Sequence, residues 1–219
     1  MKRTEEHGVT KHHDAMVENE PGTQREVLTI GHSNYAIERF LTLLKQNEVE
    51  VLADARSVPR SKYVPQFDYA PLKRSLEAAG IRYLYLGREL GGKPPDREFY
   101  DAAGHVFYSR LAVSELFLHG IERLIEGVGK YRVAVMCSEE DPHNCHRHLL
   151  VARVLADRGV KVRHIRGDGS VLLEEDLRRS EKPEGTRQME LEFVVRDEES
   201  WKSTQSVSPR RRPSVPVIG

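Results

Sequence analysis

The feature that most constrains the fold is a regular alternation of short apolar runs with longer amphipathic stretches along the middle of the chain. The apolar runs predict strands at residues 27–30, 49–53, 81–86, 132–136 and 160–165. The amphipathic stretches predict helices at residues 35–46, 68–79, 107–128 and 146–157, with Asn34 and Asp68 as caps of the first two. This alternation favours right-handed crossovers, so we predict an α/β three-layer sandwich with a mostly parallel sheet of about five strands and helices on both faces.

The polar ends of the chain set the limits of the predicted domain. Residues 1–25 carry no apolar periodicity and are predicted to be a disordered N-terminal tail. Residues 26–179 form the predicted α/β domain, and residues 180–219, which are polar with proline and serine, are predicted to be a flexible C-terminal tail. Lysine plus arginine and aspartate plus glutamate are equal at 34 each, so the net charge provides no overall attraction to nucleic acid or anionic lipid.

Cysteine content and hydropathy indicate the compartment. The two cysteines, Cys137 and Cys145, lie in one short segment instead of joining distant ones. A disulfide-stabilised domain would contain more cysteine, so a reducing compartment fits better. No apolar run is long enough to span a membrane, and the N-terminus lacks the apolar stretch of a secretion signal. We therefore expect a cytoplasmic protein with no membrane partner.

Polar side chains follow three of the predicted strands directly. The three segments are Gly31-His32-Ser33-Asn34, Asp54-Ala55-Arg56-Ser57 and Cys137-Ser138-Glu139-Glu140. The carboxyl ends of parallel strands meet at one edge of a sheet, where ligands of such folds bind. The sequence therefore predicts a single site at which these three segments converge.

The segment from Cys137 to Arg147 carries the residue types needed for nucleophilic catalysis. A thiol between a strand end and the start of a helix is favoured as a thiolate by the helix dipole and by nearby cations. We predict Cys137 as the nucleophile, His146 as its acid–base partner and Arg147 as a stabiliser of negative charge. The alternative is that Cys137 is a small structural residue that closes the strand.

The same segment also offers ligands for a metal ion. Cys137, His143, Cys145 and His146, together with His148, supply enough sulfur and nitrogen for zinc. The spacing differs from the usual paired-cysteine pattern, and the second half of a typical structural site is missing. We therefore predict no cofactor, with zinc at this segment as the alternative.

The segment after the second predicted strand has the chemistry of an anion site. Arg56 can bind a phosphate or carboxylate through two parallel hydrogen bonds, and the hydroxyl groups of Ser57 and Ser61 add donors. Asp54 is predicted to be catalytic, since it could hold a proton or orient Arg56. The other residues predicted to bind ligand are His32, Ser33, Asn34, Glu139 and Arg147. The alternative is an internal Asp54–Arg56 ion pair that stiffens the loop.

Several of these segments occur together, and in the same order, in a known family. Gly31-His32-Ser33, the run from Asp54 to Ser61, Leu90-Gly91-Gly92 and the segment from Cys137 to Arg147 resemble the domain-of-unknown-function 488 family over about residues 28–169. The resemblance implies a three-layer α/β fold and supplies no activity. Ala55 and Ser138 stand where that family is expected to have valine and alanine, and both changes leave the motif side chains in place.

A looser similarity is to rhodanese-like domains. They also have an Asp-x-Arg sequence after one strand and a cysteine after a later strand, which would imply sulfur transfer. In this chain the loop after Cys137 is longer and lacks a compact glycine-rich cradle. The segment also departs from the C-x₅-R pattern of tyrosine phosphatases, because position 143 is histidine.

A short peptide in the predicted C-terminal tail resembles the segment by which bacterial replication and repair proteins bind the sliding clamp. Its partner-binding residues are Gln188, Met189, Leu191 and Phe193. A mobile segment could place these apolar side chains in a groove, with the glutamine bonding at the groove edge. The alternative is a piece of extra strand or helix that docks on the domain.

These observations leave three functional hypotheses open. The first is an enzyme acting on a phosphate-bearing substrate, a nucleotide or nucleic acid. The second is a non-catalytic binding module recruited to DNA replication or repair through the clamp-like peptide. The third is a metal-stabilised or rhodanese-like, sulfur-handling domain.

Overall fold

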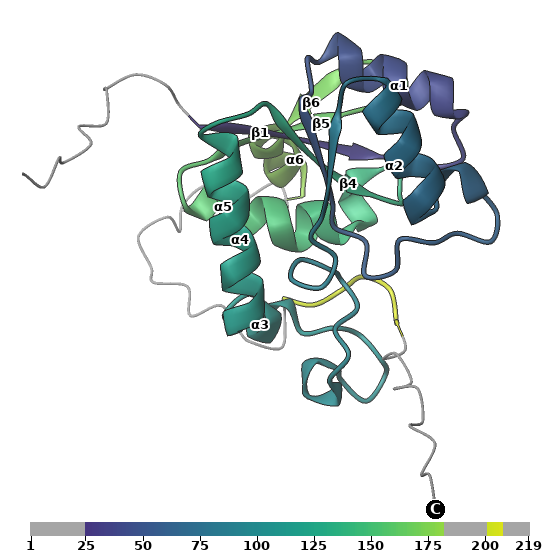
Figure 1. The fold of residues 1–219 in the computed structure, drawn as a ribbon. Coiled ribbons are helices and arrows are strands. Elements are labelled where there is room, and N and C mark those ends of the chain that lie inside the picture. The colour runs from purple at the N-terminus through teal and green to yellow at the C-terminus, as the bar shows by residue number, and fades with distance from the viewer. Residues whose placement is uncertain (1–24, 182–200, 208–219) are drawn as a thin grey trace, which may run out of the picture.

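The computed structural model describes residues 25–181 and 201–207 and contains a six-stranded sheet with the order β3-β2-β4-β1-β5-β6 (Figure 1). The strands are β1 (Glu26–Gly31), β2 (Val51–Asp54), β3 (Arg82–Tyr85), β4 (Val133–Cys137), β5 (Lys161–Ile165) and β6 (Val171–Leu173). All neighbours pair in parallel except β6, which runs antiparallel to β5. The predicted mostly parallel α/β fold is confirmed, with one strand beyond the five expected.

The helices lie on both faces of the sheet. They are α1 (Ile37–Gln46), α2 (Tyr69–Ala78), α3 (Tyr108–Leu111), α4 (Glu115–Val128), the π-helical η4 (Arg147–Ala152), α5 (Arg153–Asp157) and α6 (Glu174–Ser180). Short 3₁₀ turns are η1 (Pro65–Phe67), η2 (Arg97–Phe99) and η3 (Pro142–Asn144). Buried residues of α1 and α2 share one core cluster, and those of α4, η4 and α5 share another, which gives the three layers.

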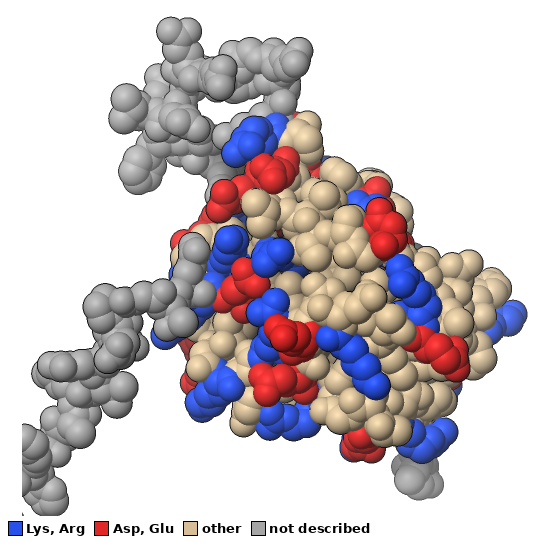
Figure 2. Space-filling view, turned by 90° about the horizontal axis from the view of Figure 1, so that it is seen from above, with Lys and Arg blue, Asp and Glu red and all other residues tan. Residues whose placement is uncertain are grey.

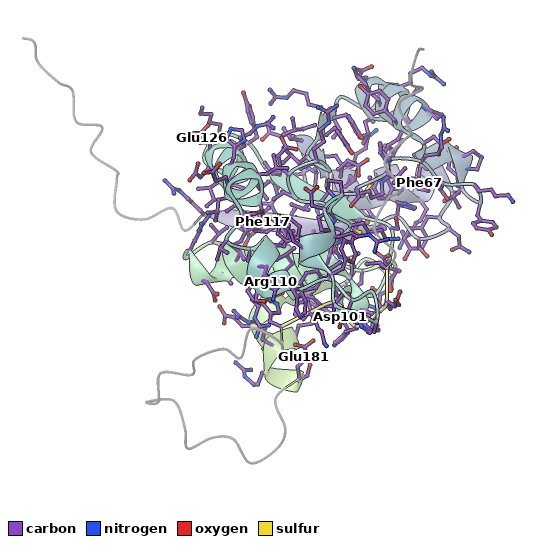
Figure 3. All side chains as sticks on the ribbon, turned by 90° about the horizontal axis from the view of Figure 1, so that it is seen from below. Phe67, Asp101, Arg110, Phe117, Glu126 and Glu181 are labelled. Carbon is purple, nitrogen blue, oxygen red and sulfur yellow. The ribbon has the colours of Figure 1, made fainter. Side chains whose placement is uncertain are left out.

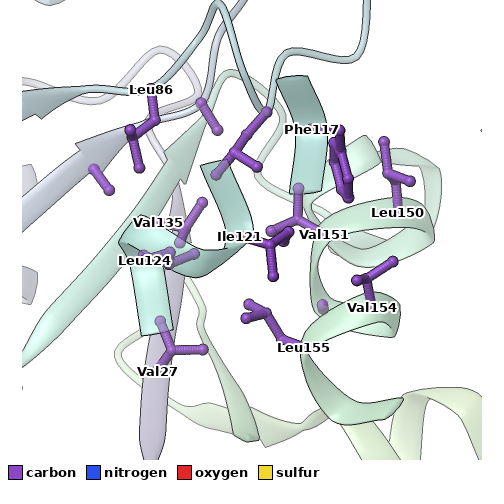
Figure 4. Close-up of a cluster of buried hydrophobic side chains, with 14 of the residues drawn as sticks. Val27, Leu86, Phe117, Ile121, Leu124, Val135, Leu150, Val151, Val154 and Leu155 are labelled. Atoms are coloured by element: carbon purple, nitrogen blue, oxygen red, sulfur yellow. The ribbon is translucent and has the colours of Figure 1, made fainter. Parts of the chain in front are cut away.

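Strand alternation produces these two clusters. In β4, Val133 and Val135 belong to the cluster under α4, whereas Ala134 and Met136 belong to the cluster under α1 and α2. Successive side chains of a strand point to opposite faces, so a strand covered on both sides is apolar throughout. Figure 4 shows the cluster under α4, in which Val135 lies beside the α4 side chains. Figure 3 labels one aromatic of each cluster, Phe117 and Phe67.

The order of the strands creates a topological switch point at the carboxyl edge of the sheet. The chain passes from β1 through α1 to β2, and from β4 through η4 and α5 to β5. β1 and β4 are hydrogen-bonded neighbours, yet their outgoing connections cross opposite faces of the sheet. Ligands of open α/β sheets bind at such a divergence. Gly31 and Cys137, which pair with each other, end the two strands at this point.

The predicted single helix over residues 107–128 is divided in two. Val113 is 71% exposed between α3 and α4, and the backbone restarts at Ser114, whose hydroxyl accepts from the Phe117 N–H at 3.4 Å. A hydroxyl that caps a new N-terminus competes with continuation of the preceding helix. β6 and α6 were not predicted from the sequence at all.

The two predicted helix caps also differ from the structure. Asn34 does not cap α1, which begins after Ala36 without a side-chain cap. Asp68 does occupy the position before α2, but its Oδ1 accepts from the Ser61 backbone N–H at 2.6 Å instead of from the helix. Asp68 therefore ties down the loop that follows β2.

Part of the segment predicted to be a flexible C-terminal tail packs against the domain. Lys202 forms a β-bridge with Phe107, and the Trp201 indole donates to the Leu149 carbonyl at 2.8 Å. The Ser203 hydroxyl accepts from the Val106 N–H at 2.9 Å. Residues 201–207, yellow in Figure 1, thus form an additional wall of the domain.

The surface is mixed in charge, as the balanced composition leads one to expect. Figure 2 shows Lys and Arg side chains interspersed with Asp and Glu over the face that it presents. Within the described part of the chain, no helix is both long enough and apolar enough to cross a membrane.

Candidate active site

A cavity of about 420 Å³ opens at the carboxyl edge of the sheet, where the loops after β2 and β4 meet. Its lining residues are Arg56, Ser57, Val58, Arg60, Gly92, Lys93, Tyr108, Cys137, Ser138, Glu139, Asn144, His146, Ser203, Thr204, Gln205 and Val207. They come from five separate stretches of the chain. Of the predicted site residues, Cys137, His146, Arg56, Ser57 and Glu139 meet in this cavity.

Cys137 and His146 form a hydrogen-bonded pair in the cavity wall. Cys137 ends β4, and its Sγ lies 3.4 Å from His146 Nδ1. His146 Nε2 lies 3.1 Å from the Ala55 carbonyl, which can only accept a hydrogen bond. The proton of a neutral His146 is therefore on Nε2, which leaves Nδ1 free to accept the Cys137 proton. This is the nucleophile–base–orienting group arrangement of thiol enzymes.

The electrostatic surroundings favour a Cys137 thiolate. A hydrogen bond from Cys145 and the positive charge of His146 lower the pKa of Cys137 to about 6, against the effect of burial. Burial and the hydrogen bond to Cys137 raise the pKa of Cys145 well above its ordinary value. Cys145 therefore stays a thiol that donates, and Cys137 is the reactive sulfur of the two.

Glu139 is the acidic member of the site. Its Oε2 lies 3.0 Å from Cys137 Sγ and 3.1 Å from Cys145 Sγ. Partial burial disfavours its ionised form, but hydrogen bonding by the two thiols outweighs this and lowers the pKa of Glu139 to about 2. Each thiol has a single proton, so Cys145 donates either to Glu139 or to Cys137, and Cys137 either to Glu139 or to His146. The negative charge of Glu139 raises the pKa of Cys137, because it repels the thiolate. Glu139 thus holds the thiol form in place and limits how far the thiolate is stabilised.

Asp54 and Arg56 form the internal ion pair that was the alternative interpretation. Arg56 donates from Nε and Nη2 to the two Asp54 oxygens at 2.9 and 2.6 Å, and Tyr83 donates to Asp54 at 2.7 Å. Asp54 is fully buried and is not a lining residue of the cavity. Its position fits a residue that positions Arg56.

His32 supports the same arginine from the other side. Arg56 Nη1 donates to His32 Nε2 at 3.2 Å, and His32 Nδ1 donates to the Ser33 carbonyl at 2.7 Å. Burial, and secondly the charge of Arg56, lower the pKa of His32 to about 4, so the ring is neutral near pH 7. The ring stacks on Phe67 with centroids 4.4 Å apart. His32 is buried behind Arg56 and does not line the cavity.

Arg147 is directed to backbone and not to the cavity. It is fully buried, and its guanidinium donates to the carbonyls of Glu139 and Glu140. A side chain at Gly31 would collide with the Glu139 carbonyl and with Arg147, which explains the glycine at the end of β1. The sequence prediction placed Arg147 on the ligand, whereas the structure makes it a brace for the loop that carries Glu139.

The paired glycines after β3 allow close packing. A Cβ at Gly92 would lie 2.7 Å from the His146 ring, and one at Gly91 would lie 2.3 Å from Ser57 Oγ. Ser57 Oγ in turn accepts from the Lys93 N–H at 2.9 Å. The glycines therefore let the Lys93 loop close over His146 and Ser57, and bring Lys93 to the cavity.

Other predicted residues lie away from the cavity. Ser33 bonds to Asn34, and Ser61 accepts from the backbone of Tyr63 and Val64. None of these is among the cavity-lining residues in the described part of the chain. The clamp-like residues Gln188, Met189, Leu191 and Phe193 lie outside the described residues.

The predicted zinc ligands are brought together only in part. The ligand atoms of Cys137, Cys145 and His146 lie within 4.8 Å of one another. His143 is not part of this group, because its Nδ1 bonds to Asp141 at 2.7 Å on the surface. Three of the four proposed ligands could thus approach one ion, and the same three explain an activated thiol without one.

Sequence reasoning missed several lining residues. Arg60 lies within the run from Asp54 to Ser61, and Lys93 directly follows Leu90-Gly91-Gly92, so their positive charge beside these motifs was the available signal. Tyr108 and Asn144 lie in segments predicted only as helix and loop. Ser203, Thr204 and Gln205 belong to the predicted tail, where the chain's one tryptophan, Trp201, was the signal of packed structure.

The chain was compared with known proteins in three ways. No curated protein and no solved structure matches it. A family match covers residues 36–154, more than half of the chain, and includes β2, β4 and the residues from Cys137 to Arg147. The matched family is described as a domain of unknown function, DUF488. The chain therefore belongs to the DUF488 family.

Proposed function

We propose that this protein is a thiol-dependent enzyme that acts on an anionic, phosphate-bearing substrate, with Cys137 as the nucleophile. The observation that carries the proposal is the Cys137–His146 pair in the wall of a cavity that three cationic side chains also line. A buried structural cysteine needs neither a cavity nor an oriented imidazole. A pKa of about 6 puts much of Cys137 in the thiolate form near neutral pH.

The cations define the substrate class. Arg56, Arg60 and Lys93 line the cavity, against one lining carboxylate, Glu139. The charge of Arg56 is paired with Asp54, so Arg60 and Lys93 supply most of the attraction for an anion. Positive charge that lines a cleft attracts an anion and raises its local concentration. A cavity of about 420 Å³ lies within the size range of small-molecule sites, and a nucleotide is one phosphate-bearing compound of suitable size.

The reaction follows from the contacts of the pair. The Cys137 proton passes to His146 Nδ1, and the thiolate attacks the electrophilic atom of the substrate. A bond from sulfur forms as the bond to the leaving group breaks, and the His146 imidazolium returns the proton to that group. A water molecule then attacks the sulfur-bound group and gives one proton to His146, and the bond to sulfur breaks as Cys137 leaves as the thiolate. The Ala55 carbonyl keeps the ring oriented throughout. A reducing compartment such as the cytoplasm would keep both thiols free for this chemistry.

Two alkylating reagents of different charge test the proposal. Iodoacetate and iodoacetamide present the same reactive carbon, but only iodoacetate is an anion. Relative to a small free thiol, we expect Cys137 to favour iodoacetate by about tenfold, because the cavity concentrates anions. Replacing Lys93 or Arg60 by alanine should reduce this preference, and inorganic phosphate or a nucleoside monophosphate should protect Cys137.

Peptide mass spectrometry would identify the modified cysteine. Cys137→Ser should abolish rapid labelling, whereas Cys145→Ser should retain it at Cys137. If Cys137 in the native protein reacts no faster than a small thiol and shows no charge preference, it is a structural residue and the proposal fails.

The clamp-like peptide supports a second, independent proposal, recruitment to DNA replication or repair. Its spacing of Gln188, Leu191 and Phe193 favours binding of an extended or turned segment in an apolar groove. The full chain should bind a bacterial sliding clamp in a pull-down or calorimetric titration. The double variant Leu191→Ala, Phe193→Ala should lose that binding, and equal binding by both proteins would reject the proposal.

A further inference from the structure

A second group of titratable side chains lies away from the cavity. His148 of η4, His164 of β5 and Glu174 of α6 are all buried, and their ligand atoms lie within 4.8 Å of one another. None of the three lines the cavity described above. Three structural elements thus direct nitrogen and oxygen donors at one buried point.

The contacts within the group converge on one atom. Glu174 Oε2 lies 2.7 Å from His148 Nδ1 and 2.8 Å from His164 Nε2. Both histidines therefore point their inner nitrogens at the same carboxylate oxygen. This leaves one nitrogen of each ring on the outer side of the group.

Each outer nitrogen has its own partner. His148 Nε2 lies 2.9 Å from Glu181 Oε1, and His164 Nδ1 lies 2.6 Å from Thr29 Oγ1. Histidines that ligate a metal usually donate their second N–H to a carboxylate or other oxygen, which fixes the ring and increases its basicity. A hydroxyl serves either tautomer, because it can both donate and accept. The outer contacts therefore suit a metal on the inner side.

An orphaned atom supplies a further, independent observation. Glu174 Oε1 is buried with no hydrogen-bond partner among the described residues, and its carboxylate belongs to a side chain only 2% exposed. Arg178 Nε is 3.9 Å away, beyond hydrogen-bond distance, and Arg178 also contacts Asp157. A buried carboxylate oxygen without a partner is costly unless something else satisfies it.

We propose that His148, His164 and Glu174 bind one divalent transition-metal ion, for which zinc is the best match. Two imidazole nitrogens and the two oxygens of Glu174 make a four-atom donor set of the kind zinc accepts. The set contains no thiolate, so it differs in chemistry from the cysteine-containing group at Cys137. Glu181, labelled in Figure 3, follows α6 and is 40% exposed, so solvent reaches the edge of the site.

The ion would have a structural role that reaches the cavity indirectly. It would tie α6 and β5 to η4, the π-helical segment that begins with Arg147. π-helical segments are uncommon and are often found at functional sites. His146 directly precedes η4, so the tie would fix the start of this element without any contact between metal and substrate. The site is independent of the proposed function, and either can fail without the other.

Metal content of the untagged, full-length protein tests the proposal. After supplementation with zinc and gel filtration, elemental analysis should find stoichiometric zinc in the wild type. His164→Gln and Glu174→Gln should lose it. His143→Gln is the matched control, because this half-buried histidine has its ring 6.3 Å from that of His148 but bonds to Asp141. It and Cys145→Ser should retain the zinc.

Cobalt binding to the wild type gives a second test that does not depend on whether the variants fold. Bound cobalt should show visible d–d bands without a thiolate-to-cobalt charge-transfer band, since the proposed ligands are nitrogen and oxygen only. A thiolate band would place the metal at Cys137 and Cys145 and overturn the proposal. So would a wild type that takes up no cobalt or zinc, or zinc that is lost in Cys145→Ser and kept in His164→Gln.

Discussion

Arg147 donates from Nη2 to the Glu140 carbonyl at 2.5 Å and so holds the loop after β4 from inside the domain. The guanidinium is fully buried and reaches two backbone carbonyls of this loop, while its Nε has no hydrogen-bond partner in the described part of the chain. The loop carries Glu139, which contacts both thiols. The geometry of the thiols thus depends on a cation that does not line the cavity.

Arg147→Met should therefore destabilise the protein. The methionine keeps much of the apolar stem but leaves the carbonyls of Glu139 and Glu140 without the donor that Arg147 supplies. We expect the free energy of unfolding to fall by about 2 kcal/mol or more, as measured by urea denaturation. Arg166→Met is the control, because Arg166 pairs with Glu140 while 23% exposed, and its removal should cost about 1 kcal/mol or less. Equal effects of the two substitutions would contradict a bracing role for Arg147.

The second prediction about stability concerns the ion pair between Asp54 and Arg56. Asp54→Asn leaves the buried Arg56 without its carboxylate, which in buried pairs costs about 3–5 kcal/mol of unfolding free energy. The double variant Asp54→Asn, Arg56→Met should be less destabilised than the sum of the single variants, since it removes the unpaired charge. Tyr83→Phe, which loses one hydrogen bond to Asp54, should cost about 1 kcal/mol. Additive behaviour in the double-mutant cycle would show that the pair is not coupled.

Five of the six strands and the meeting of the β2 and β4 loops could be predicted from the sequence because they follow from periodicity and topology. The loop after β1 was expected at the same site, but none of its residues lines the cavity. Apolar runs such as Val133–Cys137 are buried on both faces, and parallel strands bring their ends to one edge. The break at Val113 could not be seen, because an apolar residue continues the apparent helical pattern. Hydropathy does not distinguish the end of a helix, such as that of α3, from its middle.

The direction in which an individual side chain points could not be predicted from the sequence. Arg56 and Arg147 both follow strand ends in polar motifs, yet one lines the cavity and the other is fully buried against carbonyls. Which of these occurs depends on the space that Gly31 leaves, a contact between distant segments. His148 and His164 are likewise unrelated in the sequence, and in the structure both contact Glu174 of α6, an element that was not predicted.

The acidity of Cys137 should show directly in the pH dependence of its alkylation. With a pKa of about 6, the rate should rise with pH through a midpoint near 6 and be nearly constant above 7, because only the thiolate reacts. An ordinary thiol would still be gaining rate near pH 8.5. The measurement uses stopped-flow alkylation, with labelling assigned to Cys137 by mass spectrometry.

Two variants should move this midpoint in opposite directions. Cys145→Ala removes the hydrogen bond that lowers the pKa of Cys137, so the midpoint should rise. Glu139→Gln removes a negative charge 3.0 Å from the sulfur, so the midpoint should fall. Shifts of the same sign in both variants would mean that general loosening of the loop, and not these two contacts, controls the thiol.

The last prediction concerns Trp201, which anchors the segment that closes one side of the cavity. Its indole donates to Leu149, its ring packs against the core under α4, and Arg153 lies 5.0 Å from the ring centroid. Trp201→Ala should release residues 201–207 and expose Cys137, so the alkylation rate should rise several-fold while the β-sheet stays folded by circular dichroism. Trp201→Phe keeps an aromatic ring and loses only the indole N–H, so it should stay close to wild type. If alanine leaves the alkylation rate unchanged, Ser203, Thr204 and Gln205 do not restrict access to the thiol, and the cavity is bounded by the domain alone.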